Sequence, residues 1–214
     1  MTTVAIALYD RFTALDVIGP YQMLSMTPDV EVTFVAERAG GVTDDVGSLT
    51  LPATASFDEV TAPDVVVVPG GPGTAHVLEG ALPEWVARVH PTTTWTTSVC
   101  SGSLVLGAAG LLDGLPSACH YRYLEVLPMF GAEPRTDRVV ELPEQRIVTA
   151  GGVSSGIDMA LRLVELLRDR TVAEAVQLWT EYDPQPPFDS GSYAKASDPV
   201  RELAAAYEVA AREP

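Results

Sequence analysis

Cysteine is scarce in this sequence, and long apolar runs and a basic N-terminal segment are missing. Two cysteines in 214 residues do not make a disulfide framework, so free thiols in a reducing compartment are the simpler interpretation. The longest apolar runs, such as 65–68 and 104–112, are too short to span a bilayer. No basic region precedes the first apolar run, so no secretory signal is visible. We therefore expect a cytoplasmic protein with no membrane partner.

Positive charge is also scarce. Lys and Arg number 13 against 29 Asp and Glu, which gives a formal charge of −16. Nucleic-acid binding depends mainly on clustered Lys and Arg, so we expect no nucleic-acid partner. We also expect neither a metal site nor an organic cofactor.

Apolar residues, by contrast, make up 47% of the chain, enough for a substantial core. Apolar β-branched runs alternate with segments of helical spacing, and no repeat or linker divides them, so we expect one domain over 1–214. This order predicts an α/β fold, a mainly parallel sheet with helices on both faces. The predicted strands are 4–9, 30–36, 64–69, 95–99, 138–142 and 146–150, with a hairpin or short excursion over 42–53. The first predicted helix begins between Leu15 and Gly19, and a later one ends at Phe130. The other predicted helices cover 82–89, 101–109, 157–167, 171–178 and 200–211.

Cys100 lies where the predicted strand 95–99 meets the helix that follows. Ser98 and Gly102, two residues to either side, match the small-x-nucleophile-x-small pattern of a nucleophile elbow, a strained turn that presents its central residue. A helix N-terminus also favours the reactive thiolate. The alternative is a buried structural thiol, since free cysteine is among the most buried residue types. The strand–Cys–helix context favours a reactive cysteine.

Asp16 follows the first predicted strand. Its simplest role is to cap the next helix. However, the carboxyl ends of parallel strands converge on one edge of a sheet, where α/β proteins place their sites. Asp16 and Cys100 both follow strands in this way, so both are candidates for the same site.

The strand 64–69 leads directly into Gly70, Gly71 and Gly73. A glycine-rich turn between strand and helix can present backbone N–H groups to an anion. The turn is neither a G-x-G-x-x-G fingerprint nor a P-loop, because no Gly-Lys-Ser/Thr follows. A tight structural turn is the alternative. Further along, Cys119 is expected to be passive, and His120 is either an ordinary core or surface histidine or a pocket residue.

Four stretches carry a resemblance to a known family: 13–20, 68–73, 99–114 and 186–192. Together they resemble the ThiJ/PfpI superfamily, within the class I glutamine amidotransferase-like fold, and among its branches the isonitrile (isocyanide) hydratases. The resemblance implies a three-layer, flavodoxin-like sandwich and a homodimer with the site near its interface.

Residue by residue, the resemblance implies that Cys100 is the nucleophile and Asp16 its acidic partner. Ser101 stands where the hydratase branch typically has Thr. The backbone N–H groups around Gly71 and Ser101, with Gly70 beside them, would bind an anion, and His120 would line the pocket. Protease-like relatives place His directly after the cysteine, and amidotransferases use a later His-x-Glu pair. Neither is available here, because Ser101 follows Cys100 and no His follows His120.

The expected reaction is the addition of water to an isonitrile through a Cys100 thioimidate, with Asp16 as the acid and base. The apolar loop with Pro187 and Phe188, together with Tyr21, is expected to accept the organic substituent. Two alternatives stay open. One is a glyoxalase- or deglycase-like enzyme that uses the same cysteine, and the other is a redox or small-molecule sensing protein.

Overall fold

The computed structural model describes residues 1–212, the last five by their backbone only, so residues 213 and 214 of the expected domain lie outside it. A seven-stranded sheet forms its centre, in the order β10-β11-β7-β6-β1-β2-β5. All neighbours are parallel except β10 and β11. The strands are β1 (Thr2–Ala7), β2 (Val30–Ala36), β5 (Ala55–Ser56), β6 (Val65–Val68), β7 (Trp95–Val99), β10 (Val139–Leu142) and β11 (Ile147–Ala150). The most apolar strand, β6, is fully buried near the middle of the sheet, as expected for a strand covered on both faces.

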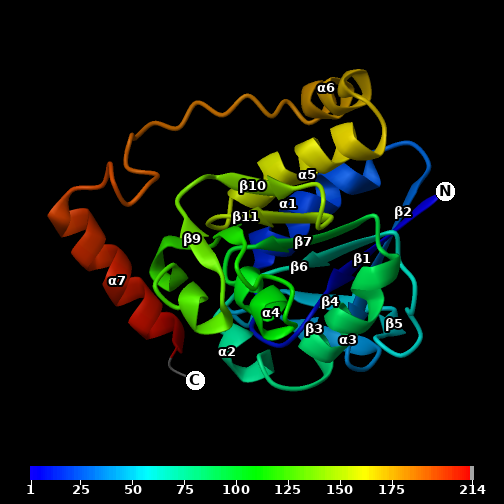
Figure 1. Ribbon diagram of the computed structural model, residues 1–214. Coiled ribbons are helices and arrows are strands. Elements are labelled where there is room, and N and C mark those ends of the chain that lie inside the picture. The colour runs from blue at the N-terminus through cyan, green and yellow to red at the C-terminus, as the bar shows by residue number, and fades with distance from the viewer. Residues whose placement is uncertain (213–214) are drawn as a thin grey trace.

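Helices cover both faces of this sheet (Figure 1). On one face, α1 (Ala14–Ser25) packs against α5 (Ser155–Leu167), and α6 (Arg170–Trp179) packs on α5. On the other face, α4 (Gly102–Ala108) packs against α2 (Thr74–Val77) and α3 (Ala81–Val89). The predicted three-layer α/β sandwich is therefore confirmed.

The strand order is the flavodoxin-like one. With the two-residue edge strand β5 left aside, the parallel strands β1, β2, β6, β7 and β11, numbered in chain order, lie in the spatial order 2-1-3-4-5. The order reverses at β1, which pairs with β2 on one side and β6 on the other. In open α/β sheets, ligands bind beyond the carboxyl ends of the strands at such a switch point.

Two small sheets flank the central one. The predicted hairpin is present as β3 (Gly40–Thr43) and β4 (Thr50–Ala53), and β8 (Pro116–Ala118) pairs with β9 (Glu133–Arg135). The helix predicted to end at Phe130 is wrong: this segment forms two 3-10 turns, Tyr121–Tyr123 and Leu127–Phe130. Pro128 lacks the N–H that a continuous α-helix needs there.

The first helix begins at Ala14, one residue before the predicted range. Thr13 takes the N-cap position, so Asp16 lies inside the first turn. Pro20 is consequently an interior residue of α1, where it has no N–H to donate to the carbonyl of Asp16.

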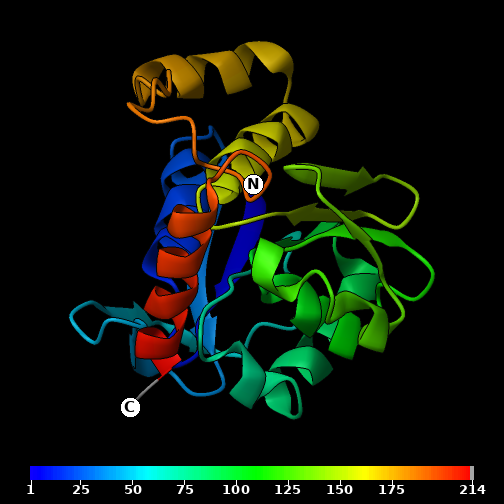
Figure 2. The same ribbon diagram turned by 90° about the vertical axis from the view of Figure 1, so that its left-hand side faces the viewer.

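Residues 183–212 form a C-terminal arm. An extended segment without helix or strand leads away from α6 to α7 (Asp198–Arg212), which runs along one side of the body (Figures 1 and 2). The expectation that the tail helix packs on the body is met only in part. Ala196 is buried and Ala204 reaches a cavity wall, but Val200, Leu203 and Tyr207 are 44%, 55% and 66% exposed. None of the helices described is long and apolar enough to cross a membrane.

Candidate active site

Three strand ends meet at the switch point and bring the predicted residues together. Asp16 lies in the first turn of α1 after β1, Gly70 follows β6, and Cys100 follows β7. The N–H of Gly70 donates to Oδ2 of Asp16 at 2.8 Å, and the side chains of Asp16 and Cys100 interact directly. The expected convergence of Asp16, Gly70 and Cys100 on one sheet edge is therefore found.

Cys100 occupies the strained turn that its neighbours predict. Its φ is +59°, in the left-handed region that costs a non-glycine residue about 1–2 kcal/mol. Its N–H is held by the carbonyls of Ala150 (3.1 Å), the last residue of β11, and Gly151 (2.8 Å), which follows it. Gly102 must lack a side chain, because a Cβ there would collide with the carbonyl of Val68. Surrounding backbone thus enforces the elbow.

The thiol of Cys100 is buried, and this corrects one expectation. Cys100 is only 5% exposed. Burial raises the pKa of its thiol well above the ordinary value, and the negative charge of Asp16 raises it further. The N–H groups of Ser101 and Val153 act in the opposite direction, because they hydrogen-bond to the sulfur. The helix that follows, α4, has only seven residues. The expected stabilisation of a free thiolate by a helix N-terminus is therefore outweighed by burial.

Asp16 is fully buried and is not a helix cap. Burial raises the pKa of its carboxyl to about 7, while hydrogen bonds from the Gly70 N–H and from Cys100 partly offset this rise. Its Oδ1 makes no well-formed hydrogen bond with any described residue. A carboxyl with one anchored oxygen and one unsatisfied oxygen beside a thiol is suited to exchange a proton with that thiol.

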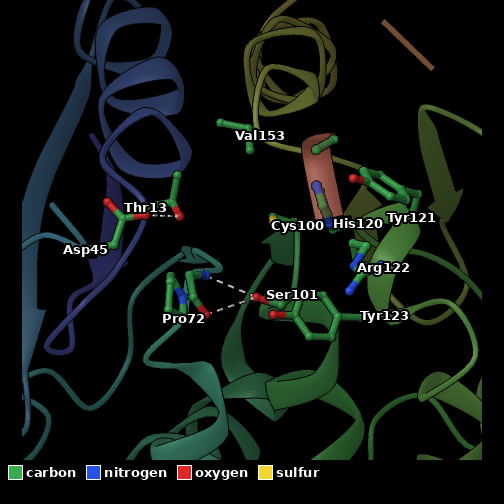
Figure 3. A pocket seen from close by; sticks show the side chains of 12 residues that line it. Thr13, Asp45, Pro72, Cys100, Ser101, His120, Tyr121, Arg122, Tyr123 and Val153 are labelled. Carbon is green, nitrogen blue, oxygen red and sulfur yellow. Dashed lines mark hydrogen bonds between the residues drawn. The ribbon is translucent and has the colours of Figure 1, made fainter. Parts of the chain in front are cut away.

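The backbone donors of the glycine-rich turn are engaged inside the protein. The Gly70 N–H is used by Asp16, and the Gly71 N–H donates to Oγ of Ser101 at 3.0 Å (Figure 3). Gly71 was expected to present its N–H to a substrate anion; here that N–H donates to Ser101, and its use by a substrate stays a prediction. Gly70 is required for close packing, because a Cβ on it would lie 2.5 Å from the N and 2.6 Å from the Oγ of Ser101.

The hydroxyl of Ser101 is buried and belongs to a polar network. Its Oγ lies 2.8 Å from Oγ1 of Thr74, which lies 2.9 Å from the phenol oxygen of Tyr9. The phenol in turn donates to the carbonyl of Pro69 at 2.9 Å. Desolvation raises the pKa of Tyr9 well above its ordinary value, so the phenol keeps its proton.

A cavity of about 220 Å³ opens at Cys100 (Figure 3). Its lining residues are Thr13, Asp45, Gly71, Pro72, Cys100, Ser101, His120, Tyr121, Arg122, Tyr123, Val153 and Ala204. His120 is thus placed in the pocket, as the resemblance implied, with its ring 4.4 Å from that of Tyr121. The expectation for Tyr21 and Phe188 is wrong: Tyr21 packs on Phe34, and Phe188 is 78% exposed on the arm.

Sequence reasoning missed several residues of this site. Val153 supplies an N–H to the sulfur, and Thr74 and Tyr9 hold the Ser101 hydroxyl. Each carried a signal: Val153 lies in a second glycine-rich junction, Thr74 follows the first one, and Tyr9 ends the first apolar run. Across the described residues, no group of three or more His, Cys, Asp or Glu side chains is arranged to hold a metal ion. Both cysteines are free, and burial raises the pKa of Cys119 to about 12.

The chain is similar to known proteins in sequence and in structure. The chain is 42% identical over 186 residues to the isonitrile hydratase of Pseudomonas putida, and the alignment covers 86% of this chain and 80% of that protein. A crystal structure of a ThiJ/PfpI family protein from Pseudomonas syringae is 37% identical, with a TM-score of 0.90, covering 99% of this chain and 89% of that one. Schizosaccharomyces pombe DJ-1 shares the fold, with a TM-score of 0.72 and 16% identity. That match covers 86% of this chain and all of DJ-1. Residues 2–166 match the DJ-1/PfpI family, and the chain belongs to it.

Proposed function

We propose that the protein is an isonitrile hydratase, a hydro-lyase that converts an organic isonitrile and water into an N-substituted formamide. The observation that carries the proposal is the buried pair of Cys100 and Asp16, in which the carboxyl has a pKa of about 7. Similarity to the Pseudomonas putida isonitrile hydratase supports the substrate class.

The first half of the reaction uses the pair as a proton shuttle. Asp16 takes the proton of the Cys100 thiol, and the sulfur forms a bond to the terminal carbon of the isonitrile. The electron pair on that carbon then takes the proton from Asp16, which gives a thioimidate and restores the carboxylate. A group whose pKa lies near the working pH is well suited to give and receive a proton in this way. The N–H groups of Ser101 and Val153 stabilise the sulfur while it carries charge.

The second half adds water. The oxygen of water bonds to the thioimidate carbon while Asp16 takes one water proton and returns a proton to the substrate nitrogen. The tetrahedral adduct then breaks its carbon–sulfur bond. The hydroxyl proton passes to the sulfur, and the formamide leaves with the thiol regenerated. Water, isonitrile and product balance without an oxidant or a cofactor.

The cavity sets the size of the substrate. An apolar cavity of about 150 Å³ binds benzene in another protein, so a cavity of about 220 Å³ suits an isonitrile with one small ring or a short alkyl chain. Rings of His120, Tyr121 and Tyr123 supply its aromatic wall.

The direct test is to incubate the protein with a small alkyl or aryl isonitrile and follow formamide formation. We expect turnover in the wild type, and loss of at least about a hundredfold in Cys100→Ala and Asp16→Asn. Unchanged activity in Cys100→Ala would exclude the thioimidate route. Consumption of methylglyoxal without any turnover of isonitriles would favour a glyoxalase-like enzyme instead.

A sensing role is disfavoured by the burial of the cysteine. Redox sensors use exposed thiols of low pKa, whereas Cys100 is buried with a raised pKa. Titration with peroxide, followed by mass spectrometry, separates the two functions. Rapid and selective formation of a Cys100 sulfinate, with no isonitrile turnover, would support the sensor.

We also propose that the protein is a homodimer whose C-terminal arm lies at the interface. The apolar side chains of Val200, Leu203 and Tyr207 share one side of α7 and are exposed, while Ala204 lines the cavity. Burial of this stripe by a second copy would place the interface beside the site. Light scattering should give twice the chain mass. Leu203→Glu should lower it, whereas Val46→Glu, at a residue 78% exposed on the small hairpin, should not.

We propose that the arm belongs to the same domain as the body, so that limited proteolysis leaves no separately stable piece. We propose a cytoplasmic location, consistent with two free thiols, which cell fractionation would test.

A further inference from the structure

One wall residue of the cavity at Cys100 comes from the C-terminal arm. The other lining residues lie between positions 13 and 153, in the body, whereas Ala204 belongs to α7. The arm reaches α7 through the extended segment that leads away from α6, and α7 then runs along one side of the body (Figures 1 and 2). The boundary of the cavity at Ala204 therefore depends on where the arm lies.

A stack of rings joins the arm to the same cavity. The ring of Tyr193, in the arm, stacks on that of Tyr121, with centroids 5.3 Å apart and an angle of 28° between the planes. Tyr121 lines the cavity, and its ring lies 4.4 Å from that of His120, which lines it too (Figure 3). Stacked aromatic pairs at such separations attract one another. The Tyr193 ring therefore docks the arm directly on the wall of the site.

Arg201 connects this stack to α7. Its guanidinium lies 4.6 Å from the centroid of the Tyr193 ring, within the range of a cation–π interaction. Its Nε also donates to the backbone carbonyl of Tyr193 at 2.9 Å. Arg201 lies in α7, less than one helical turn before Ala204. The docked ring and the cavity-lining methyl group are therefore linked through one short piece of helix.

The rest of the arm buries little surface. Of residues 183–207, Ala196 alone is buried, and Arg201, Ala204 and Ala205 are half-buried. Few other side chains of the arm can hold it in place, because burial of apolar surface is the main source of such stability. The Tyr193 stack therefore has a large share in positioning α7 on the body.

We infer that the arm sets the length of the isonitrile that the site accepts: Ala204 closes the cavity, and Tyr193 keeps it there by stacking on Tyr121. The inference rests on the proposed function. Ala204 is a specificity residue, because its methyl group leaves room that a longer side chain would fill. Tyr193 is a positioning residue, because it acts on the substrate through Ala204. A methyl isonitrile fits inside the part of the cavity formed by the body, whereas a longer alkyl chain extends to Ala204.

The first test replaces the methyl group of Ala204 by an isobutyl group. In Ala204→Leu we expect kcat/KM for n-butyl isonitrile to fall at least about tenfold, because the end of its chain loses space, while methyl isonitrile stays within about twofold. Ala206→Leu is the matched control, since Ala206 lies on the same helix, is exposed and is not among the residues that line the cavity. An equal loss for both isonitriles in Ala204→Leu, or the same loss in Ala206→Leu, would overturn the inference.

The second test releases the ring stack. In Tyr193→Ala the arm loses its anchor on Tyr121, so kcat/KM for n-octyl isonitrile relative to n-butyl isonitrile should rise at least about threefold. Tyr193→Phe keeps the ring and should keep the wild-type ratio. Phe188→Ala removes a ring that is 78% exposed on the same arm and should also leave the ratio unchanged. No rise in Tyr193→Ala, or an equal rise in Phe188→Ala, would count against the arm as the length-setting element.

Alkylation of Cys100 tests the arm without any turnover. Iodoacetamide and the larger N-phenylmaleimide are applied to the wild type and to Tyr193→Ala, and peptide mass spectrometry follows both cysteines. We expect the maleimide to label Cys100 at least about threefold faster in Tyr193→Ala, and iodoacetamide to change less. Cys119 is 5% exposed and is not among the cavity-lining residues, so its labelling should stay the same. Equal acceleration at Cys119 would show a general loosening and would refute the inference.

The two kinds of measurement separate this inference from the proposed function. Labelling of Cys100 that responds to Tyr193→Ala, without turnover of any isonitrile, would overturn the proposed function and keep the arm as the outer wall of the site. Hydration of isonitriles, with neither labelling nor chain-length preference responding to the arm variants, would overturn the inference alone.

Discussion

Oδ2 of Asp16 accepts a 2.8 Å hydrogen bond from the N–H of Gly70, a residue 54 positions later in the chain. Because of this bond, the two carboxyl oxygens differ in their hydrogen bonding. Oδ2 is anchored to the turn after β6, whereas Oδ1 has no well-formed bond within the part of the chain described here. A proton on Asp16 therefore belongs on Oδ1, since Oδ2 already uses a lone pair to accept from Gly70.

The rate of isonitrile hydration should depend on pH with an acidic limb. Burial raises the pKa of Asp16 to about 7, and below that pH both Asp16 and Cys100 are protonated. Because the thiol then has no base, kcat/KM should fall about tenfold per pH unit below about pH 7. A pH–rate profile from pH 5 to 9 checks this. A flat profile down to pH 5 would show that Asp16 is not the base.

Asp16→Asn should change the dependence of stability on pH. The folded state raises the pKa of Asp16 from 3.8 to about 7, so the charged form is disfavoured by folding. The stability associated with the neutral carboxyl is fully present below about pH 4 and is lost as the pH rises towards 7. Relative to Asp16→Asn, the wild type should therefore lose up to roughly 4 kcal/mol between pH 4 and pH 8, at about 1.4 kcal/mol per pKa unit. Urea unfolding of both proteins at the two pH values measures this difference. An equal pH dependence in the two proteins would contradict the raised pKa.

Gly70→Ala should disrupt the site without removing a reactive group. The new Cβ would lie 2.5 Å from the backbone N of Ser101, so the turn and the elbow must separate. This movement would weaken the anchor of Asp16, and hydration should fall by at least about a hundredfold. Gly191→Ala is the matched control, since a Cβ there meets nothing within 4 Å. Full activity in Gly70→Ala would show that the close contact is not needed.

His120→Ala should affect substrate binding more than chemistry. His120 lines the cavity beside Tyr121, and the proposed reaction assigns its proton transfers to Asp16. We expect KM to rise several-fold and kcat to stay within about threefold, because binding contacts are lost while the reactive pair is intact. Steady-state kinetics check this. A fall in kcat of a hundredfold or more would assign His120 a role in the reaction.

The sequence allowed the prediction of those features that depend on local patterns. The elbow at Cys100 follows from small residues around a strand–helix joint, and the convergence of Asp16 and Cys100 follows from the rule that parallel strand ends meet. Most strands and helices were predicted within a few residues because their periodicity is strong. Pro128 was the local signal overlooked in the segment before Phe130.

Features that depend on packing could not be predicted in the same way. Nothing in the order of residues shows that the N–H groups of Gly70 and Gly71 turn inward, or that Val153 reaches the sulfur. The burial of Cys100, which raises its pKa, depends on elements from the whole chain. The sequence pattern therefore identified the reactive residues, while their protonation and their backbone donors required the structure.

The support of Cys100 by segments that come later has a consequence for biosynthesis. Its N–H is held by Ala150 and Gly151, and the N–H of Val153 points to its sulfur. Until those residues have been made, none of these contacts to Cys100 can form. At 5–20 residues per second, the fifty or so residues after Cys100 take roughly 3–10 s to synthesise. The turn that holds Cys100 is therefore completed only late in synthesis, when β11 and the following turn have docked.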